Sequence, residues 1–400
     1  MGNKYQHRQG SAVICVTGQD GQPVANQEIT IKQKTGSVMF GTAGFETVGL
    51  LSGEFEGIEK EHSEKRVEKM LDIFDFITLP FYWGRFEPER GKPVTKETLK
   101  AAKWLQEKGK TVKGHPLCWH TVCAPWLIEG DMSDEEILRL QLERIERDVT
   151  DFKGVIDIWD VINEVVIMPI FDRYDNGVTR ICKREGQVGL VKKVFAEAKK
   201  ANPDAVLLIN DFDMSVDYSD LVAKLLDAGV PIDAIGLQSH MHQGIWSKEK
   251  TDEVLERFSK FGLPLHFTEI NLVSGDLMPE HIVDLNDFVP EEWVSTPEGE
   301  ARQAEQAVEF YTRLYECPLI EAVTYWSFTD GGWLNAPAGL VKKDGQAKPA
   351  YDALYEKIKK EWLTQEFRAK TNEQGKVEVS GFRGSYTAVY DGGSIEFEIL

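Results

Sequence analysis

Between about residue 38 and residue 363 the chain alternates short apolar runs with longer amphipathic stretches. Short apolar runs predict buried strands, and stretches in which apolar residues recur every three or four positions predict helices. The pattern predicts eight strands, near 38–41, 73–81, 111–117, 155–162, 205–210, 233–239, 264–270 and 321–328. It also predicts eight helices, near 60–72, 95–108, 133–149, 186–201, 216–229, 249–261, 298–315 and 348–363. Eight strands that alternate with eight helices predict a (β/α)8 TIM barrel of the α/β class.

The two ends of the chain show a different pattern, in which apolar and polar residues alternate. Residues 11–36 alternate around a turn at 18–23, and glycines separate three more alternating segments after about residue 367. This pattern predicts short antiparallel strands. Since neither end has enough strands to be stable alone, we expect one small accessory β-sandwich from residues 11–36 and 367–400. The catalytic barrel then occupies residues 37–366.

Side chains that are capable of chemistry recur where the predicted strands end. Active sites of (β/α)8 barrels lie at the carboxyl ends of the strands, so these side chains are expected to meet at one mouth. In chain order they are Tyr82 and Trp83, His115 with Trp119 and His120, Asn163 and Glu164, Asn210 and Asp211, Gln238 and His240, Glu269, and Trp326.

Two of the predicted strands run directly into a glutamate, in the segments Trp159–Glu164 and Leu265–Ile270. Glycoside hydrolysis uses two carboxyl groups on opposite sides of the bond that is broken. Glu164 and Glu269 could form such a pair. A glutamate just past a strand can also be an inert surface residue or part of a structural ion pair, so the two residues alone leave the question open.

Six segments in the same order resemble glycoside hydrolase family 10, the endo-β-1,4-xylanase family. The resemblance covers about residues 38–363. Gly114–His120 is similar to the motif of the third strand, and Trp159–Glu164 is similar to the segment that carries the acid/base. Phe267–Ile270 is similar to the segment of the nucleophile. Gln238–His240 and Tyr325–Asp330 are similar to the ends of strands six and eight, and Lys348–Leu354 is similar to the start of the last helix.

The resemblance implies a retaining β-glycoside hydrolase that acts on a β-1,4-xylan-like polysaccharide or oligosaccharide. Glu164 would be the acid/base and Glu269 the nucleophile, with His240 hydrogen-bonded to Glu269. For His120, substrate contact and structural support remain open. The candidate substrate-binding residues are His115, Trp119, Asn163, Gln238, His240, Trp326, Trp333 and Tyr82. The indoles of Trp326 and Trp333 are flat platforms for the apolar face of a sugar, although both could be core aromatics.

The end of the second strand departs from the family pattern. Family members usually carry a glutamate, an asparagine and a lysine there, which bind sugar on the non-reducing side of the cut. Thr78, Leu79 and Tyr82 occupy these positions in the alignment that places Trp83 on the family tryptophan. We therefore expect weakened recognition on that side. A hydrolase of another or a decorated β-glycoside, possibly exo-acting, and a non-catalytic carbohydrate-binding barrel remain the alternatives.

Charge and composition narrow the choice of partners. A net charge of −20 and a pI near 4.9 disfavour nucleic acid and anionic membranes, since both attract basic surfaces. A carbohydrate suits this chain better. There is no apolar run of 18 residues and the first ten residues are polar, so the chain as it stands reads as cytoplasmic, or as secreted if a signal peptide was removed. Oligomeric state is left open.

The sequence favours a site without metal or cofactor. Histidines and aspartates near the strand ends, such as His115, His240 and Asp211, could bind a metal in a metal-dependent barrel hydrolase. The chain lacks compact metal motifs and glycine-rich phosphate loops, however, so we expect neither a metal nor a nucleotide cofactor. The five cysteines are odd in number and scattered, which predicts reduced structural thiols.

Overall fold

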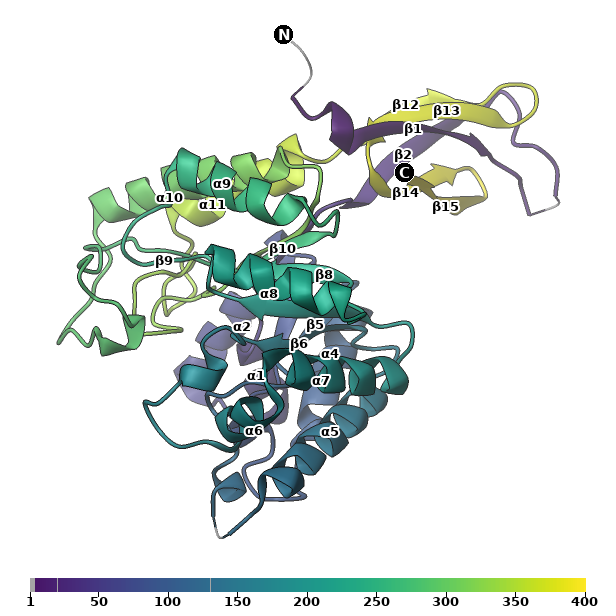
Figure 1. The fold of residues 1–400 in the computed structure, drawn as a ribbon. Helices are drawn as coiled ribbons and strands as arrows, with labels where there is room; N and C mark the ends of the chain where they lie inside the picture. The colour runs from purple at the N-terminus through teal and green to yellow at the C-terminus, as the bar shows by residue number, and fades with distance from the viewer. Residues whose placement is uncertain (1–3, 20, 130) are drawn as a thin grey trace.

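The computed structural model describes residues 4–19, 21–129 and 131–400. Its centre is a closed parallel barrel, in which each strand pairs with the next and the last pairs with the first (Figure 1). The prediction of a (β/α)8 barrel is confirmed. The eight strands, in order around the barrel, are β3 (Met39–Ala43), β4 (Phe76–Pro80), β5 (Thr111–His115), β6 (Ile158–Asn163), β7 (Val206–Asp211), β8 (Ala234–Leu237), β10 (Leu265–Leu272) and β11 (Ile320–Tyr325).

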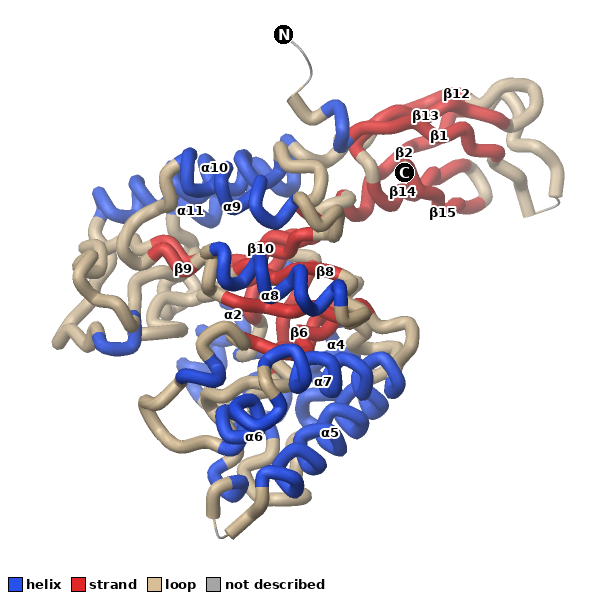
Figure 2. Tube along the Cα trace, viewed as in Figure 1, coloured by secondary structure: helices blue, strands red, loops and turns tan. Residues whose placement is uncertain are grey.

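The amphipathic stretches form the helices that surround the barrel (Figure 2). They are α2 (Gly57–Ile73), α4 (Thr95–Glu107), α5 (Asp134–Asp151), α7 (Gln187–Ala201), α8 (Val216–Asp227), α9 (Lys248–Ser259), α10 (Pro297–Tyr315) and α11 (Pro349–Tyr355), which continues as a π-helical turn over Glu356–Glu361. The predicted strand at 73–81 begins late, because Ile73 still belongs to α2 and β4 starts at Phe76.

Several short elements of the connecting loops were not predicted, because a segment of two to nine residues is too short to show a clear period. The short helices are α1 (Glu46–Ser52), α3 (Trp83–Phe86) and α6 (Gly177–Glu185), and the short strand is β9 (His240–Met241). Single 3-10 turns occur at Gln6–Arg8, Pro125–Leu127, Met168–Ile170 and Leu285–Asp287.

The strand β10 shows how burial shapes the barrel sequence. All eight of its residues are buried, as expected for a parallel strand covered on both faces. Four of them, His266, Thr268, Glu269 and Asn271, are polar. Polar groups in such a place need hydrogen-bond partners to offset their lost hydration. Polar residues in a fully buried strand therefore point to a site inside the barrel.

Strands from both ends of the chain form two antiparallel sheets beside the barrel. One sheet pairs β1 (Gln9–Cys15) with β13 (Lys376–Phe382). The other has the order β12 (Phe367–Lys370), β2 (Glu28–Gly36), β14 (Gly384–Tyr390), β15 (Gly393–Ile399). The expectation that both termini share these sheets is confirmed, and the sheets enclose an apolar cluster of their own. The exact domain boundaries stay a prediction.

One detail of the terminal prediction is wrong. β1 and β2 read as neighbouring antiparallel strands joined by a turn, yet they lie in different sheets and each pairs with strands from the C-terminal segment. Only Thr17 and Pro23 form a bridge within the connection. Both sheets need C-terminal strands to cover the apolar residues of β1 and β2, so local pairing gives way to long-range pairing.

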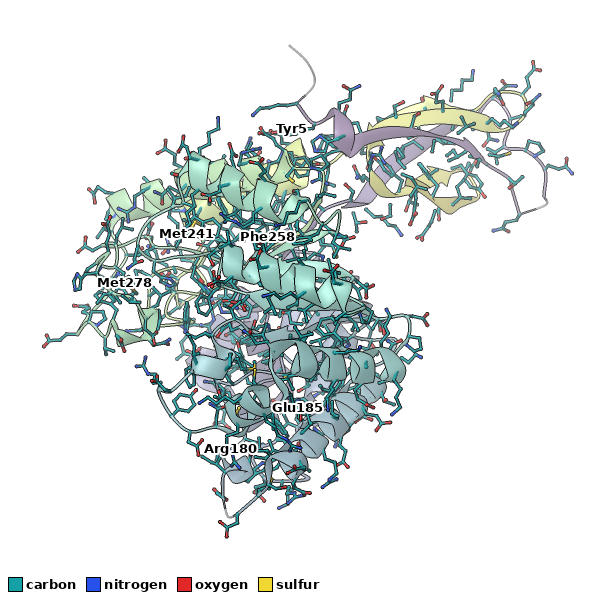
Figure 3. The ribbon with its side chains drawn as sticks, viewed as in Figure 1. Tyr5, Arg180, Glu185, Met241, Phe258 and Met278 are labelled. Atoms are coloured by element: carbon teal, nitrogen blue, oxygen red, sulfur yellow. The ribbon has the colours of Figure 1, made fainter. Side chains whose placement is uncertain are left out.

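The terminal sheets attach to the amino-terminal face of the barrel. The guanidinium of Arg8 donates to the carbonyl oxygens of Tyr315, Cys317 and Ile320 at 3.1, 2.6 and 3.0 Å, and Ile320 is the first residue of β11. In Figure 3 Tyr5 lies on this side, whereas Met278, in a loop beyond the carboxyl end of β10, lies on the opposite side. The sheets are therefore remote from the barrel mouth.

Within the described part of the chain, no helix is long and apolar enough to cross a membrane. The five cysteines are all unpaired.

Candidate active site

Glu164 and Glu269 belong to one hydrogen-bonded network at the barrel mouth. Asn210 Nδ2 donates to Glu269 Oε1 at 2.9 Å and to Asn163 Oδ1 at 2.7 Å. Gln238 Nε2 donates to the same Asn163 oxygen at 3.1 Å and to Glu164 Oε1 at 3.3 Å. The side-chain oxygen Oδ1 of Asn163 thus accepts from both Asn210, the partner of Glu269, and Gln238, the partner of Glu164. The sequence placed all five of these residues at the mouth, and the structure adds the hydrogen-bonding role of Asn210.

The backbone at Glu164 is held in an uncommon conformation. Its φ of +56° lies in the left-handed region, which a residue with a Cβ rarely adopts and which often marks a functional position. The Glu164 amide donates to the carbonyl of Asn210 at 2.8 Å. Two residues on, the Val166 amide donates to Asp211 Oδ2 at 3.0 Å. The end of β7 therefore fixes where the carboxyl group of Glu164 lies.

Glu164 is set up to hold a proton at neutral pH. Burial and, second, the nearby Glu269 raise the pKa of Glu164 to about 8, although hydrogen bonds from Trp119 and Gln238 oppose the rise. The Trp119 indole Nε1 donates to Glu164 Oε2 at 2.8 Å, a contact that the sequence did not predict. A carboxylic acid kept neutral in this way can donate a proton to a leaving group.

Glu269 is 4% exposed and both of its carboxyl oxygens have partners. Oε1 accepts from Asn210, and Oε2 lies 3.1 Å from His240 Nε2. The other ring nitrogen of His240 lies 2.8 Å from Asn271 Oδ1, and Asn271 Nδ2 in turn donates to Ser327 Oγ at 3.0 Å. The predicted contact between His240 and Glu269 is confirmed. This chain of contacts fixes the orientation of the Glu269 carboxyl group.

His115 lies above a buried ion pair inside the barrel. Its Nδ1 is 2.7 Å from Asp160 Oδ2, and Lys113 Nζ lies 2.8 Å from the same oxygen. Burial opposes ionisation of Asp160, yet the charge of Lys113 and the hydrogen bond with His115 prevail and lower its pKa to about 2. The buried aspartate therefore stays ionised and holds the His115 ring at the floor of the mouth. Sequence reasoning did not assign Lys113 or Asp160 to the site.

Aromatic rings form one wall of the mouth. Tyr82 lies 5.6 Å from His115 and 5.4 Å from Trp119, measured between ring centroids. Phe45 then connects Tyr82 to Trp326, with centroid distances of 5.7 and 5.5 Å. Phe45 was missed, although an apolar residue just beyond the first predicted strand was the available signal.

Trp333 belongs to the same mouth. It packs 4.5 Å from His240, beside the nucleophile candidate. Sequence reasoning placed this tryptophan in the site, and the structure brings it there.

The expectation for the second strand needs a correction. Thr78 and Leu79 are fully buried within β4 and do not border the mouth. Thr78 pairs with Lys113, and Pro80 pairs with His115, so Thr78 lies one layer deeper in the barrel than His115. Of the three residues aligned with the family's polar contacts, only Tyr82 can meet a substrate. The polar contacts are nevertheless missing from this wall.

The structure favours the supporting role for His120. The residue is buried, and its ring packs 4.4 Å from that of Phe171. Burial lowers the pKa of His120 to about 4, which leaves the ring neutral. His120 therefore packs behind Trp119 and fixes the loop that carries it.

The described residues contain no group of three or more His, Cys, Asp or Glu side chains arranged to hold a metal ion. Asp211, one of the candidate ligands, instead accepts hydrogen bonds from the amides of Val166 and Asp213. Burial raises the pKa of Asp211 to about 7. Its role here is to shape the loops, and a metal-free reaction stays a prediction.

Comparison with known proteins agrees with this architecture. The family model described as glycosyl hydrolase family 10 matches residues 57–357. The endo-1,4-beta-xylanase B of Thermotoga neapolitana is 28% identical over 321 residues, which cover 74% of this chain and 83% of the relative. The chain matches 39% of the length of an endo-1,4-beta-xylanase/feruloyl esterase from Xylanibacter ruminicola, at 27% identity and over 66% of this chain.

Solved structures give the same result. Native xylanase 10B from Thermotoga maritima superposes with a TM-score of 0.64 at 25% identity, over 81% of this chain and 96% of that one. Xylanase 10B from Thermotoga petrophila, in complex with xylobiose, has a TM-score of 0.65 at 25% identity, over 81% and 95% of the two chains. Since the family model spans most of the barrel and both Glu164 and Glu269 lie within it, the chain belongs to glycosyl hydrolase family 10 and is a glycoside hydrolase.

Proposed function

We propose that the protein hydrolyses a β-1,4-xylan-like polysaccharide or oligosaccharide with retention of anomeric configuration. The observation that carries this proposal is the network in which Glu164 and Glu269 share partners but differ in environment. Glu164, whose pKa is raised to about 8, holds a proton at neutral pH, whereas Glu269 receives hydrogen bonds on both oxygens. The relatives named above as xylanases support the choice of sugar.

In the first step the Glu164 proton moves to the glycosidic oxygen while a Glu269 oxygen attacks the anomeric carbon. The bond between that carbon and the glycosidic oxygen breaks, the leaving group departs as an alcohol, and the sugar is esterified on Glu269. Asn210 and His240 hold the attacking carboxyl group in place. Asn163, whose amide Nδ2 donates to Glu164 Oε1 at 3.2 Å, is the residue that we assign to the sugar 2-hydroxyl, a contact that strengthens in the transition state.

In the second step Glu164, now ionised, takes a proton from water, and the water oxygen attacks the anomeric carbon. The ester bond to Glu269 breaks and both glutamates return to their starting states. Two inversions at the same carbon give net retention. A separation of roughly 5–5.5 Å between the two carboxyl groups is the value this mechanism requires.

Two measurements test the proposal. A panel of aryl β-glycosides identifies the sugar, and aryl β-xylosides are expected to be cleaved fastest. Proton NMR of the first product formed should then show the β-anomer before mutarotation. The α-anomer as first product would refute the nucleophile role of Glu269, and absence of turnover on every β-glycoside would refute hydrolysis altogether.

A second candidate within the same chemistry is a short or decorated β-glycoside. Polar groups that bind sugar hydroxyls discriminate strongly between substrates. In this mouth the rings of Tyr82, Phe45 and Trp326 form the wall, and no polar residue replaces the glutamate, asparagine and lysine that are usual in the family. This wall therefore favours a short or decorated substrate. We expect slow cleavage of linear xylohexaose. A kcat/KM in the usual enzymatic range of about 10⁴–10⁸ M⁻¹s⁻¹ would show that other residues bind the second xylose.

A further inference from the structure

A cavity of about 400 Å³ opens beside the barrel mouth. It lies between the end of β3, the helix α2 and the loop that follows β11. Phe45, Trp326 and Trp333, which border the mouth, also line this cavity. Its volume falls within the range of small-molecule sites, so it can hold a sugar unit attached to a glycan in the mouth. Neither glutamate of the site lines it.

The carboxylates that line the cavity are already paired with cations. Arg66 is buried and donates to Glu46 Oε1 at 2.8 Å through Nε and to Glu59 Oε1 at 2.6 Å through Nη2. Lys348, which is also buried, lies 2.9 Å from Asp330 Oδ1. These three carboxylates therefore do not present uncompensated negative charge to a ligand.

Lys343 is the remaining cation of the lining. Its ammonium forms no ion pair or hydrogen bond with any described residue, while its backbone carbonyl accepts from buried Arg66. The side chain lies along Gly331, because a Cβ added there would come 3.0 Å from Lys343 Cε and 3.3 Å from Nζ. Gly331 thus leaves room for the lysine at the edge of the cavity. An ammonium that no described carboxylate neutralises can pair with an anionic group of a ligand.

We propose that this cavity binds a carboxylate-bearing substituent of the glycan, such as a uronic acid branch, with Lys343 as its ionic partner. The inference rests on the proposed function and names the decoration that the mouth accommodates. Phe45 and Trp326 provide an apolar surface for the branch ring, and the lysine pairs with its carboxylate. A charge-assisted contact of this kind contributes more than a neutral hydrogen bond.

The test compares kcat/KM for three xylo-oligosaccharides with the same backbone, which carry a glucuronosyl branch, a neutral arabinosyl branch or no branch. We expect the wild-type enzyme to prefer the acidic branch by roughly five- to tenfold. Lys343→Gln should remove that preference and leave the rate on an aryl β-xyloside unchanged. Lys342→Gln is the matched control, since that neighbour pairs with Glu300 at 3.3 Å and does not line the cavity.

The outcomes separate the two proposals. If aryl β-xyloside is cleaved but the acidic and neutral branches are equivalent, or if Lys343→Gln keeps the acidic preference, the assignment of the cavity is wrong while the hydrolase proposal stands. If no β-glycoside is cleaved, the proposed function itself fails.

Discussion

Replacing Glu269 by glutamine is expected to lower the pKa of Glu164. The substitution keeps the size of the side chain and an oxygen that can accept from Asn210, but it removes the negative charge. Burial is the largest cause of the raised pKa of Glu164, and the charge of Glu269 is the second. Only the second cause disappears in Glu269→Gln, so the pKa should fall without returning to its ordinary value.

The size of this fall follows from the raised pKa of Glu164 and from the carboxyl separation of a retaining pair. A rise from 4.5 to about 8 corresponds to roughly 5 kcal/mol at 1.36 kcal/mol per pKa unit. Two unit charges about 5.5 Å apart, the separation of a retaining pair, repel by about 3 kcal/mol at an effective dielectric constant of about 20. That energy corresponds to about two pKa units. It is an upper limit for the contribution of the Glu269 charge, since burial is the larger cause of the raised pKa. We expect a fall of about one to two pKa units.

The assay is a pH titration by NMR of protein labelled with ¹³C at the glutamate carboxyl carbons. The Glu164 resonance is the one that disappears in Glu164→Gln. Glu253→Gln, at an exposed position on α9, is the control and should leave the titration unchanged. A Glu164 titration that does not move in Glu269→Gln would show that the carboxyl groups are too far apart for a retaining mechanism. A fall to about 4.5 would show that burial contributes nothing.

Four further outcomes are expected. Glu164→Ala should retain far more activity on aryl glycosides with activated leaving groups than on natural glycosides, because only the latter need a proton; equal losses would contradict the assigned roles. For the wild type, kcat/KM on a natural glycoside should fall as pH rises past about 8, where Glu164 loses its proton; an alkaline limb two units lower would contradict the acid role. EDTA should leave the rate unchanged, and a loss restored by one divalent ion would identify a metal. Arg8→Ala should reduce the free energy of unfolding by about 3 kcal/mol, since buried carbonyls lose a charged donor; denaturant melts measure this, with exposed Arg383→Ala as control.

The barrel could be predicted from the sequence because its strands are buried on both faces. A strand such as β10 combines buried apolar residues with polar residues that include Glu269, so the same segment revealed both the element and the glutamate. Strand order followed from the count, since consecutive parallel strands joined by helices lie side by side. The prediction that His240 contacts Glu269 was correct, because both residues lie in segments that resemble the family.

What could not be predicted depends on three-dimensional neighbours. Phe45 stands in a connecting segment, and its place between Tyr82 and Trp326 appears only when the ends of β3, β4 and β11 meet. Thr78 was wrongly placed at the mouth, because the depth of a residue in a barrel depends on the stagger of neighbouring strands. The pairing of β1 with β13 was hidden for a similar reason, since nothing local distinguishes it from pairing with β2.

The terminal sheets also determine the order in which this chain can fold during synthesis. β1 and β2 emerge from the ribosome before the barrel strands, but their partners are β13, β12 and β14, so their edges stay unpaired until the barrel strands have been made. The barrel has time to form in this interval, because most of its strands pair with close neighbours in sequence. Its closing strand β11, which pairs with β3, also precedes the C-terminal sheet strands. The polar and charged residues on β2, among them Lys32 and Lys34, then protect a newly made chain from edge-to-edge aggregation. The terminal sheets can therefore be completed only after the strands that follow the barrel have been made.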